Sequence, residues 1–433
     1  MAKNSHFEGS ARLFRALPSS HDDLSERETA AFASPNHSKK GESSVSINPS
    51  ERLLNLPPQF FADLVGRAEK LRQAGHPVIN LGQGNPDQST PTAIVDALKN
   101  AADNPLYHRY IPFNGLFELK RAVADWYLVR YGVVIDPDRE VSILIGSKIG
   151  LQEISLALLN PGDTAMVPDP GYPDYWSGIR LAGAEMMSLP LRPDLDFLPD
   201  LGAWVPSAKL AFLNYPNNPT GRLASPQFLD EVIRLASKDH VVLAHDLAYG
   251  DITFDGRQSV SLLSRPGGKD VGVEFTTVSK SYNMAGWRLG FAVGNPTLIR
   301  YLDLLQDHLH CSQFGAIQMA GIAALGQPPE ALAQLRTLYQ HRRDLLIASA
   351  AEAGWEIPPS EGSVFVWCPI PTSESAVKFC DRVLRDADVV LAPGTGFGEA
   401  GEGYVRISLT ASSDQLVEAM RRIGQLMSSS TRG

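Results

Sequence analysis

Short apolar runs alternate with helical patterns through the middle of this chain. Strand-like runs span residues 141–145, 164–167, 210–213, 241–244 and 275–278. Stretches with helical spacing of apolar residues lie between them, for example from Pro226 to Ser237. This alternation predicts an α/β domain with a mostly parallel sheet covered on both faces. In such domains ligands bind beyond the carboxyl ends of the strands.

The pattern changes on both sides of this region. Residues 59–74 have helical spacing and residues 77–81 form a short strand-like run. Beyond residue 327 we expect a long helix at 329–353, strands at 364–367, 389–391 and 404–409, and a closing helix at 413–427. We interpret residues 91–327 as a large domain and residues 328–433 as a smaller α+β domain. Residues 51–90 form an arm and complete the small domain.

Residues 1–50 are rich in Ser, Asn, His and charged residues, and they show no sustained periodicity. We expect a disordered or loosely docked extension. It has no apolar segment like that of a signal peptide, and its acidic residues argue against a transit peptide. A cytoplasmic location is the expectation.

Composition removes several classes of protein from consideration. The 433 residues are 43% hydrophobic and 20% charged, which is typical of a globular protein of one large or two smaller domains. A formal net charge of -9 makes nucleic acid a poor partner. The three cysteines are too scattered for a disulfide framework or a zinc site. No apolar run is long enough to span a membrane.

Lys280 comes two residues after the end of the apolar run 275–278 and lies in a segment of Ser, Asn and Gly. A lysine in this place can form a Schiff base with pyridoxal phosphate, and Arg288, eight residues later, can hold the phosphate. A single Ser-Lys pair is more often part of a solvated loop. The hypothesis therefore depends on other motifs at neighbouring strand ends.

Two of these motifs follow the strands at 141–145 and 164–167. Gly146, Ser147 and Lys148 stand where a strand turns into a helix, and backbone N–H groups there can cradle a phosphate. A plain tight turn is the alternative. Tyr172 lies between two prolines and can stack on a heteroaromatic ring, or it can simply pack in its loop.

The next two strand ends carry an amide and an acid. Asn218 follows the run 210–213, and its side chain can donate to a phenolate oxygen. Asp246 ends the run that begins at Val241, and a buried carboxylate there needs a cationic partner such as a pyridinium nitrogen. An aspartate that caps the next helix is the competing interpretation. Tyr249 can hydrogen-bond the same ring oxygen as Asn218.

Arg406 is the one arginine in the strand-like run 404–409, where a guanidinium suits a substrate carboxylate. A solvent-facing arginine on a half-exposed strand is the alternative. Just before this run, residues 396–401 match the GxGxxG string of dinucleotide sites, but a strand rather than a helix follows. We therefore expect a mobile loop that leads to Arg406. His308, His310 and Cys311 lack a matching second pair, so we predict no metal site.

Together these motifs resemble the class I/II aminotransferases, which are pyridoxal phosphate enzymes of fold type I. The resemblance extends from Leu56 to Met427. It implies a large domain with a seven-stranded, mostly parallel sheet and a smaller α+β domain. The segments 80–87, 169–178 and 282–288 look most like a bacterial branch that includes LL-diaminopimelate and methionine/ketomethiobutyrate aminotransferases.

The resemblance also implies roles for single residues. Lys280 would be the Schiff-base lysine, Asp246 would pair with the pyridine nitrogen, and Tyr249 with Asn218 would hold the 3-hydroxyl group. Tyr172 would stack on the ring. The implied phosphate ligands are Ser147, Ser279 and Arg288, and Lys148 adds positive charge beside them.

The implied substrate ligands are Arg406, Gly84 and Asn218, with Arg406 on the α-carboxylate. Tyr110 would reach the phosphate of a neighbouring subunit, which implies a homodimer with shared active sites. The implied reaction is a ping-pong exchange between an α-amino acid and a 2-oxo acid, with Lys280 moving the proton. A β-eliminating lyase acting on a sulfur amino acid, or a pyridoxal phosphate-binding regulator without turnover, are the alternatives.

Overall fold

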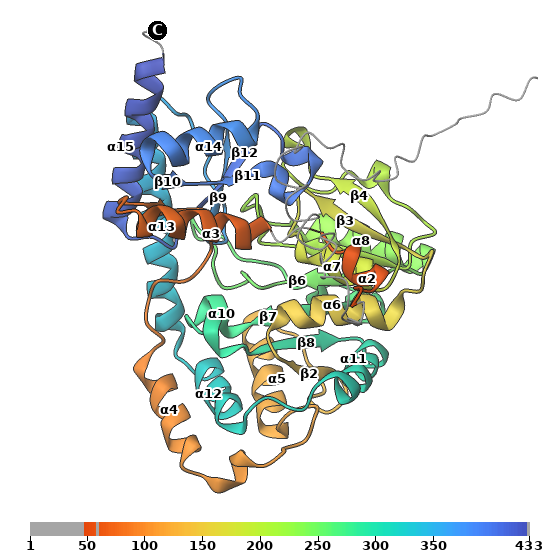
Figure 1. Cartoon of the computed structure of the whole chain (residues 1–433). Helices are drawn as coiled ribbons and strands as arrows, with labels where there is room; N and C mark the ends of the chain where they lie inside the picture. The colour runs from red at the N-terminus through yellow and green to blue at the C-terminus, as the bar shows by residue number, and fades with distance from the viewer. Residues whose placement is uncertain (1–46, 58–59, 431–433) are drawn as a thin grey trace, which may run out of the picture.

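The computed structural model describes residues 47–57 and 60–430 (Figure 1). Most of the predicted N-terminal extension, residues 1–46, lies outside the described residues. No helix in the described part of the chain is long and apolar enough to cross a membrane.

A seven-stranded sheet in the order β2-β8-β7-β6-β5-β3-β4 forms the centre of the larger part of the molecule. Neighbouring strands from β7 to β4 are parallel, whereas β8 is antiparallel to both β2 and β7. All strands except β8 therefore end at the same edge, and the predicted α/β fold type I is confirmed. The strands are β2 (Val141–Leu144), β3 (Thr164–Asp169), β4 (Glu185–Pro190), β5 (Leu210–Asn214), β6 (Val242–Asp246), β7 (Gly272–Thr277) and β8 (Gly290–Gly294).

Helices cover both faces of this sheet, as the alternation of side chains along β5 illustrates. Leu210 and Phe212 pack in the same apolar cluster as α6 and α7, whereas Ala211 and Leu213 pack in the cluster of α8. Every side chain of β5 is buried, as expected for a central parallel strand. The helices around the sheet are α4 (Thr92–Ala102), α5 (Phe117–Tyr131), α6 (Ser147–Leu158), α7 (Asp174–Leu181), α8 (Pro226–Asp239), α9 (Gly268–Val271), α10 (Val278–Ser281), α11 (Pro296–Leu309) and α12 (Gly315–Leu325).

The start of α8 shows how the sequence sets an element boundary. The Ser225 side chain accepts a hydrogen bond from the Phe228 N–H, and Pro226 takes the first helical position, where no N–H is needed. The helix ends at Asp239, and His240 after it adopts a left-handed conformation with φ of 57°. The predicted helix from Pro226 is thus extended by two residues beyond Ser237.

The remaining strands form two small sheets near the C-terminal end of the chain. Strand β1 (Ile79–Asn80) pairs with β10 (Val389–Val390), and β12 (Tyr404–Ser408) lies between β11 (Ala392–Pro393) and β9 (Phe365–Pro369). The pairing of β1 with β10 brings the segment before Pro91 to the C-terminal part, as the sequence predicts. The domain boundaries themselves stay predictions. Helix α2 (Glu51–Leu54) lies against α7 of the larger part (Figure 1). The helices beside the small sheets are α3 (Phe60–Gln73), α13 (Pro329–Glu352), α14 (Ala376–Ala387) and α15 (Ser413–Ser430).

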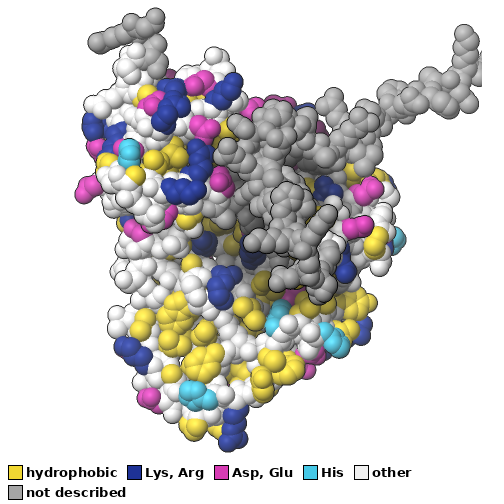
Figure 2. Space-filling model, viewed as in Figure 1, with side chains coloured by type: hydrophobic (Ala, Val, Ile, Leu, Met, Phe, Trp, Pro, Cys, Tyr) yellow, Lys and Arg dark blue, Asp and Glu magenta, His cyan; other side chains and the backbone are white. Residues whose placement is uncertain are grey.

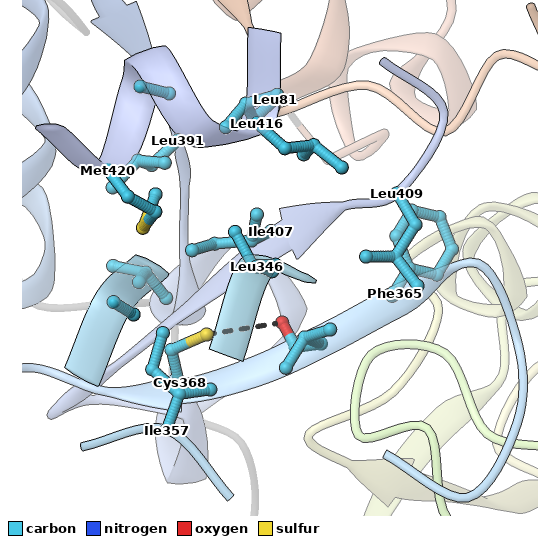
Figure 3. Close-up of a cluster of buried hydrophobic side chains, with 14 of the residues drawn as sticks. Leu81, Leu346, Ile357, Phe365, Cys368, Leu391, Ile407, Leu409, Leu416 and Met420 are labelled. Carbon is cyan, nitrogen blue, oxygen red and sulfur yellow. Dashed lines mark hydrogen bonds between the residues drawn. The ribbon is translucent and has the colours of Figure 1, made fainter. Parts of the chain in front are cut away.

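A separate apolar core holds this smaller part together. Figure 3 shows Phe365 and Cys368 of β9 and Ile407 of β12 packed with Leu346 of α13 and Met420 of α15. All five side chains are buried. This core fixes the position of β12, the strand that carries Arg406.

Candidate active site

Polar side chains gather at the carboxyl edge of the large sheet. Asp246 is the last residue of β6 and lies in register with Asn214, the last residue of β5. Lys280 follows β7 in the short helix α10, where the Thr277 hydroxyl accepts a hydrogen bond from the Ser279 N–H at 3.1 Å. The parallel register therefore brings residues that are far apart in sequence to one edge.

Asp246 is a buried carboxylate held by two hydrogen bonds. The Ala248 N–H donates to Oδ1 at 3.1 Å and the Tyr175 hydroxyl donates to Oδ2 at 2.8 Å. Burial raises the pKa of Asp246 to about 6, although these two hydrogen bonds act in the opposite direction. Both of these donors are neutral, so a cationic ring nitrogen would supply the partner that burial demands. One oxygen accepts from the backbone, as the capping alternative requires, and the other accepts from Tyr175, so the cofactor role of Asp246 stays a prediction.

Tyr175 was not identified from the sequence. It belongs to the first turn of α7, its side chain is fully buried, and its ring stacks on Phe212 with centroids 4.8 Å apart. Its ring also meets the edge of Tyr172, with centroids 5.6 Å apart and planes at 82°. Tyr175 thus contacts both Asp246 and the predicted ring-stacking residue. Its position three residues after Tyr172 gives no sign of this.

Lys280 connects the large sheet to a loop that precedes Pro91. Its half-buried side chain donates from Nζ to the Gly84 carbonyl oxygen at 2.7 Å. Burial lowers the pKa of Lys280 to about 8, and the nearby charges of Arg406 and Arg288 lower it further. The amine therefore exists partly in the neutral, nucleophilic form near neutral pH.

Positively polarised groups gather at the start of α6. Gly146, with φ of 81°, precedes the helix, and a Cβ at this position would lie 2.2 Å from Nη2 of Arg288. The Arg288 guanidinium thus lies against a helix N-terminus, where the backbone N–H groups also attract anions. The hydroxyls of Ser279 and Thr277 are 2.9 Å apart in the same region. The Arg288 guanidinium and the N-terminus of α6 are both positive, and their closeness suits a phosphate. Ser147 is the first residue of this helix.

Lys148 has a partner within the chain. Its Nζ lies 2.8 Å from the Asp174 carboxylate at the start of α7. The Lys148 side chain is 40% exposed, whereas that of Asp174 is 9% exposed. Part of the positive charge expected for phosphate is therefore balanced by Asp174, and the cofactor role of Lys148 stays a prediction.

Arg406 is buried, so the solvent-facing alternative is wrong. Its guanidinium donates to the Asn218 side-chain oxygen and to the Gly82 carbonyl oxygen, each at 2.8 Å. The Phe365 and Phe397 rings lie on it, with centroids 3.8 and 4.5 Å from Cζ. Burial lowers the pKa of Arg406 to about 9. A desolvated arginine in this setting is well suited to bind a carboxylate.

The bond from Arg406 fixes the orientation of the Asn218 amide. A guanidinium can only donate, so the Asn218 oxygen faces it and the NH2 group faces the other way. Tyr249 is buried nearby, with its ring 5.8 Å from that of Phe365. Burial raises the pKa of Tyr249, while the positive charge of Arg406 lowers it and the negative charge of Asp246 raises it. The charges of Arg406 and Asp246 thus both act on the Tyr249 phenol, and Arg406 contacts the Asn218 amide directly.

Tyr110 is the predicted site residue that lies apart from the others. It belongs to the loop between η1 (Pro105–His108) and α5, and its side chain is 82% exposed. Its ring meets Phe113, with centroids 6.4 Å apart. Its role requires a second subunit and stays a prediction.

The expected loop before Arg406 is folded as two short 3-10 turns, η6 (Gly394–Phe397) and η7 (Glu399–Gly401). Strand β12 follows, as the interpretation against a dinucleotide site requires. The loop packs against the end of β3, where the Gly171 N–H donates to the Phe397 carbonyl oxygen at 2.7 Å. It is therefore part of the wall of the site.

Comparison with known proteins identifies the class of this chain. Residues 76–423 match the family model described as aminotransferase class I and II. The chain belongs to this family, and it is a pyridoxal phosphate-dependent aminotransferase. This conclusion favours neither the β-eliminating lyase nor the regulator.

Individual relatives place it in the branch suggested by its motifs. It is 47% identical over 386 residues to the L-glutamine--4-(methylsulfanyl)-2-oxobutanoate aminotransferase of Bacillus subtilis, covering 88% of this chain and 97% of the relative. It is 45% identical to the LL-diaminopimelate aminotransferase of Moorella thermoacetica, covering 88% and 99%. The substrate-bound structure of BacF from Bacillus subtilis superimposes with a TM-score of 0.86 at 41% identity, covering 88% and 98%.

The residues at the sheet edge fit the cofactor of this family. Three groups fit the three chemically distinct ends of pyridoxal phosphate. They are the buried Asp246 carboxylate, the Lys280 amine with its lowered pKa, and the Arg288 guanidinium at a helix N-terminus. They match, in that order, the ring nitrogen, the aldehyde and the phosphate.

Proposed function

We propose that Lys280 and Asp246 are the catalytic pair of the transamination and that Arg406 binds the α-carboxylate of both substrates. The observation that carries this proposal is the bond from Arg406 to Asn218, because it joins the carboxylate-binding guanidinium to the residues grouped around Asp246. Tyr249 assists by holding the 3-hydroxyl group of the cofactor together with Asn218. Ser147, Ser279 and Arg288 hold the phosphate, and Tyr172 covers the ring.

Lys280 acts as a nucleophile and then as a proton carrier. Bound pyridoxal phosphate supplies an aldehyde that condenses with amines and a ring that accepts electrons from the substrate Cα. With its pKa lowered to about 8, the free Lys280 amine would be able to take the proton from the substrate Cα and to give it back as an ammonium group, acting first as base and then as acid. Asp246, in its ionised form, would keep the ring nitrogen of the bound cofactor protonated. Arg406 keeps the substrate oriented throughout.

We propose glutamine with 4-(methylsulfanyl)-2-oxobutanoate, and LL-diaminopimelate, as the first substrates to test. The relatives that carry these names share 47% and 45% of their aligned residues with this chain, so their substrates are the best supported starting points. The purified holoenzyme is titrated with single amino acids while its visible absorbance is recorded. Bleaching by a donor, with recovery after addition of its 2-oxo acid partner, is expected. An unchanged spectrum with both donors would contradict this substrate assignment.

We also propose a homodimer in which Tyr110 reaches the partner's site. The support is the exposure of apolar side chains around this residue, at Leu106, Phe113, Phe117 and Phe314. In Figure 2 hydrophobic side chains gather at the lower end of the molecule, over the segment between α4 and α5. Such a patch is typical of an interface. Sedimentation should give twice the chain mass, and Tyr110→Phe should weaken cofactor binding without changing the mass.

A further inference from the structure

Asp169, the last residue of β3, is a buried carboxylate to which the proposed chemistry gives no task. It is 5% exposed, and it is followed within three residues by Tyr172. Its Oδ1 accepts a hydrogen bond at 3.1 Å from the N–H of Ala400, a residue of η7 that precedes Arg406 by six positions. Its Oδ2 lies 3.4 Å from the Ser188 hydroxyl. The carboxylate therefore spans the space between the large sheet and the loop 394–401.

The loop is shaped to receive this carboxylate. Gly398 has φ of 135°, and a Cβ there would lie 2.0 Å from Oδ1 of Asp169. Only a glycine allows this approach without displacing one of the two groups. Gly171 adds a second tie, since its N–H donates to the Phe397 carbonyl oxygen at 2.7 Å. The segment that carries Tyr172 thus holds the loop at two points.

Phe397 connects the position of this loop to Arg406, the residue proposed to bind the substrate carboxylate. Its ring is fully buried and lies 4.5 Å from Cζ of Arg406, on one side of the guanidinium. It also meets the ring of Trp367, with centroids 5.9 Å apart and planes at 88°. If the loop moved away from Asp169, this side of Arg406 would open to water. A guanidinium exposed to water binds a carboxylate more weakly than a desolvated one.

We propose that Asp169 is a positioning residue for substrate binding: its carboxylate ties the loop 394–401 to the end of β3 and so keeps Phe397 against Arg406. This inference rests on the proposed role of Arg406. It predicts a defect in the binding of amino and oxo acids that leaves cofactor binding unchanged. A residue that merely stabilised the fold would affect both.

The test compares variants of the holoenzyme. Asp169→Ala should raise KM for the amino donor on the order of tenfold or more, because a hydrogen bond to a charged group is lost. The kcat and the dissociation constant of pyridoxal phosphate should change by less than about twofold, a shift well below that of one such bond. Asp169→Asn, which keeps an oxygen acceptor, should recover most of the loss. Glu185→Gln, which alters an exposed carboxylate on β4, the strand beside β3, is the matched control and should behave like the wild type.

Hydrogen–deuterium exchange of the same holoenzymes gives a readout that does not depend on turnover. Amides of residues 395–402 should exchange faster in Asp169→Ala than in the wild type, while those of α6 stay unchanged. Gly398→Ala should reproduce both effects, and the double variant should be less impaired than the sum, because removal of the carboxylate leaves room for the new Cβ.

An unchanged KM in Asp169→Ala, or unchanged exchange of the loop, would overturn the inference. A loss of pyridoxal phosphate affinity at constant KM would overturn it as well. A wild type that shows no half-reaction with any amino acid would instead refute the proposed function. The exchange rates alone would then decide whether Asp169 ties the loop.

Discussion

The half of the site that we assign to the cofactor and the half that we assign to the substrate are built differently. Asp246 and Lys280 stand at the ends of adjacent parallel strands of one sheet, so strand register fixes their spacing. Arg406 stands on a small antiparallel sheet and is held by Asn218 and by the Gly82 carbonyl, which come from distant parts of the chain. The cofactor, which stays bound, is thus assigned to the rigid edge of one sheet. The substrates, which exchange, are assigned to contacts between separate segments of the chain.

Lys280→Ala should have the largest effect and should impair both halves of the site, because the Lys280 amine reaches from the sheet to the Gly84 carbonyl oxygen. Loss of both nucleophile and proton carrier should lower transamination by at least about 10³-fold. The rate is measured with saturating donor, and circular dichroism verifies the fold. Activity within tenfold of the wild type would refute the role of this lysine.

Asp246→Asn should disable the cofactor half. The amide has nearly the same shape but cannot balance a cationic ring nitrogen, so pyridoxal phosphate affinity and kcat should each fall by about 10²-fold. Titration of the apoenzyme with pyridoxal phosphate gives the affinity. Wild-type values for both quantities would mean that Asp246 only caps the turn at Ala248.

Arg406→Lys should disable the substrate half alone. A lysine keeps the charge but lacks the planar fork, so KM for amino and oxo acids should rise by about 10- to 100-fold. The affinity for pyridoxal phosphate should stay within about twofold, well under the loss of one charged hydrogen bond. An equal fall in both affinities would show that the two halves do not act separately.

Tyr175→Phe should have the smallest effect and should sharpen the picture of the cofactor half. Without the hydroxyl that favours the ionised form, the pKa of Asp246 rises further above about 6. Asp246 is neutral below its pKa, so cofactor affinity should fall as the pH drops through about 6, and in the variant this fall should begin at higher pH. At pH 7 we expect about a fivefold loss.

The measurement for Tyr175→Phe is apoenzyme titration with pyridoxal phosphate between about pH 5 and pH 8, a range that brackets the raised pKa. Tyr215→Phe is the matched control. Tyr215 is also a buried phenol at this sheet edge, but it donates to the Phe197 carbonyl oxygen at 3.1 Å instead of to Asp246. Identical pH profiles for both variants would show that the Tyr175 hydroxyl does not affect the ionisation of Asp246.

The sequence was most informative where function coincides with strand ends. Apolar runs followed by polar residues led to the prediction of Asp246, Asn218 and Lys280 as site residues, and the structure places them at one edge because parallel strands bring their carboxyl ends together. The contact of Tyr175 with Asp246 joins residues 71 positions apart and depends on how α7 packs on the sheet. Local patterns do not encode such a contact. The contact of Asp169 with the loop could not be predicted for the same reason, since its partner Ala400 lies 231 residues away.

Two predicted residues show the other limits of sequence reasoning. The spacing placed Lys148 beside the phosphate loop, but it could not reveal that Asp174 lies 2.8 Å from its ammonium group. Tyr110 is exposed in a single chain, and its task depends on an assembly that periodicity does not describe. Charge pairing across helices and contacts between subunits both depend on tertiary geometry.

Gly84 has a practical consequence for anyone who wishes to alter the substrate range. A Cβ at this position would lie 2.3 Å from the Phe365 ring, which in turn covers Arg406. A library that randomises the segment 83–85 would therefore lose most of its members to displacement of that ring. Gln83 and Asn85 are exposed on either side and are the positions to diversify, with Gly84 left unchanged.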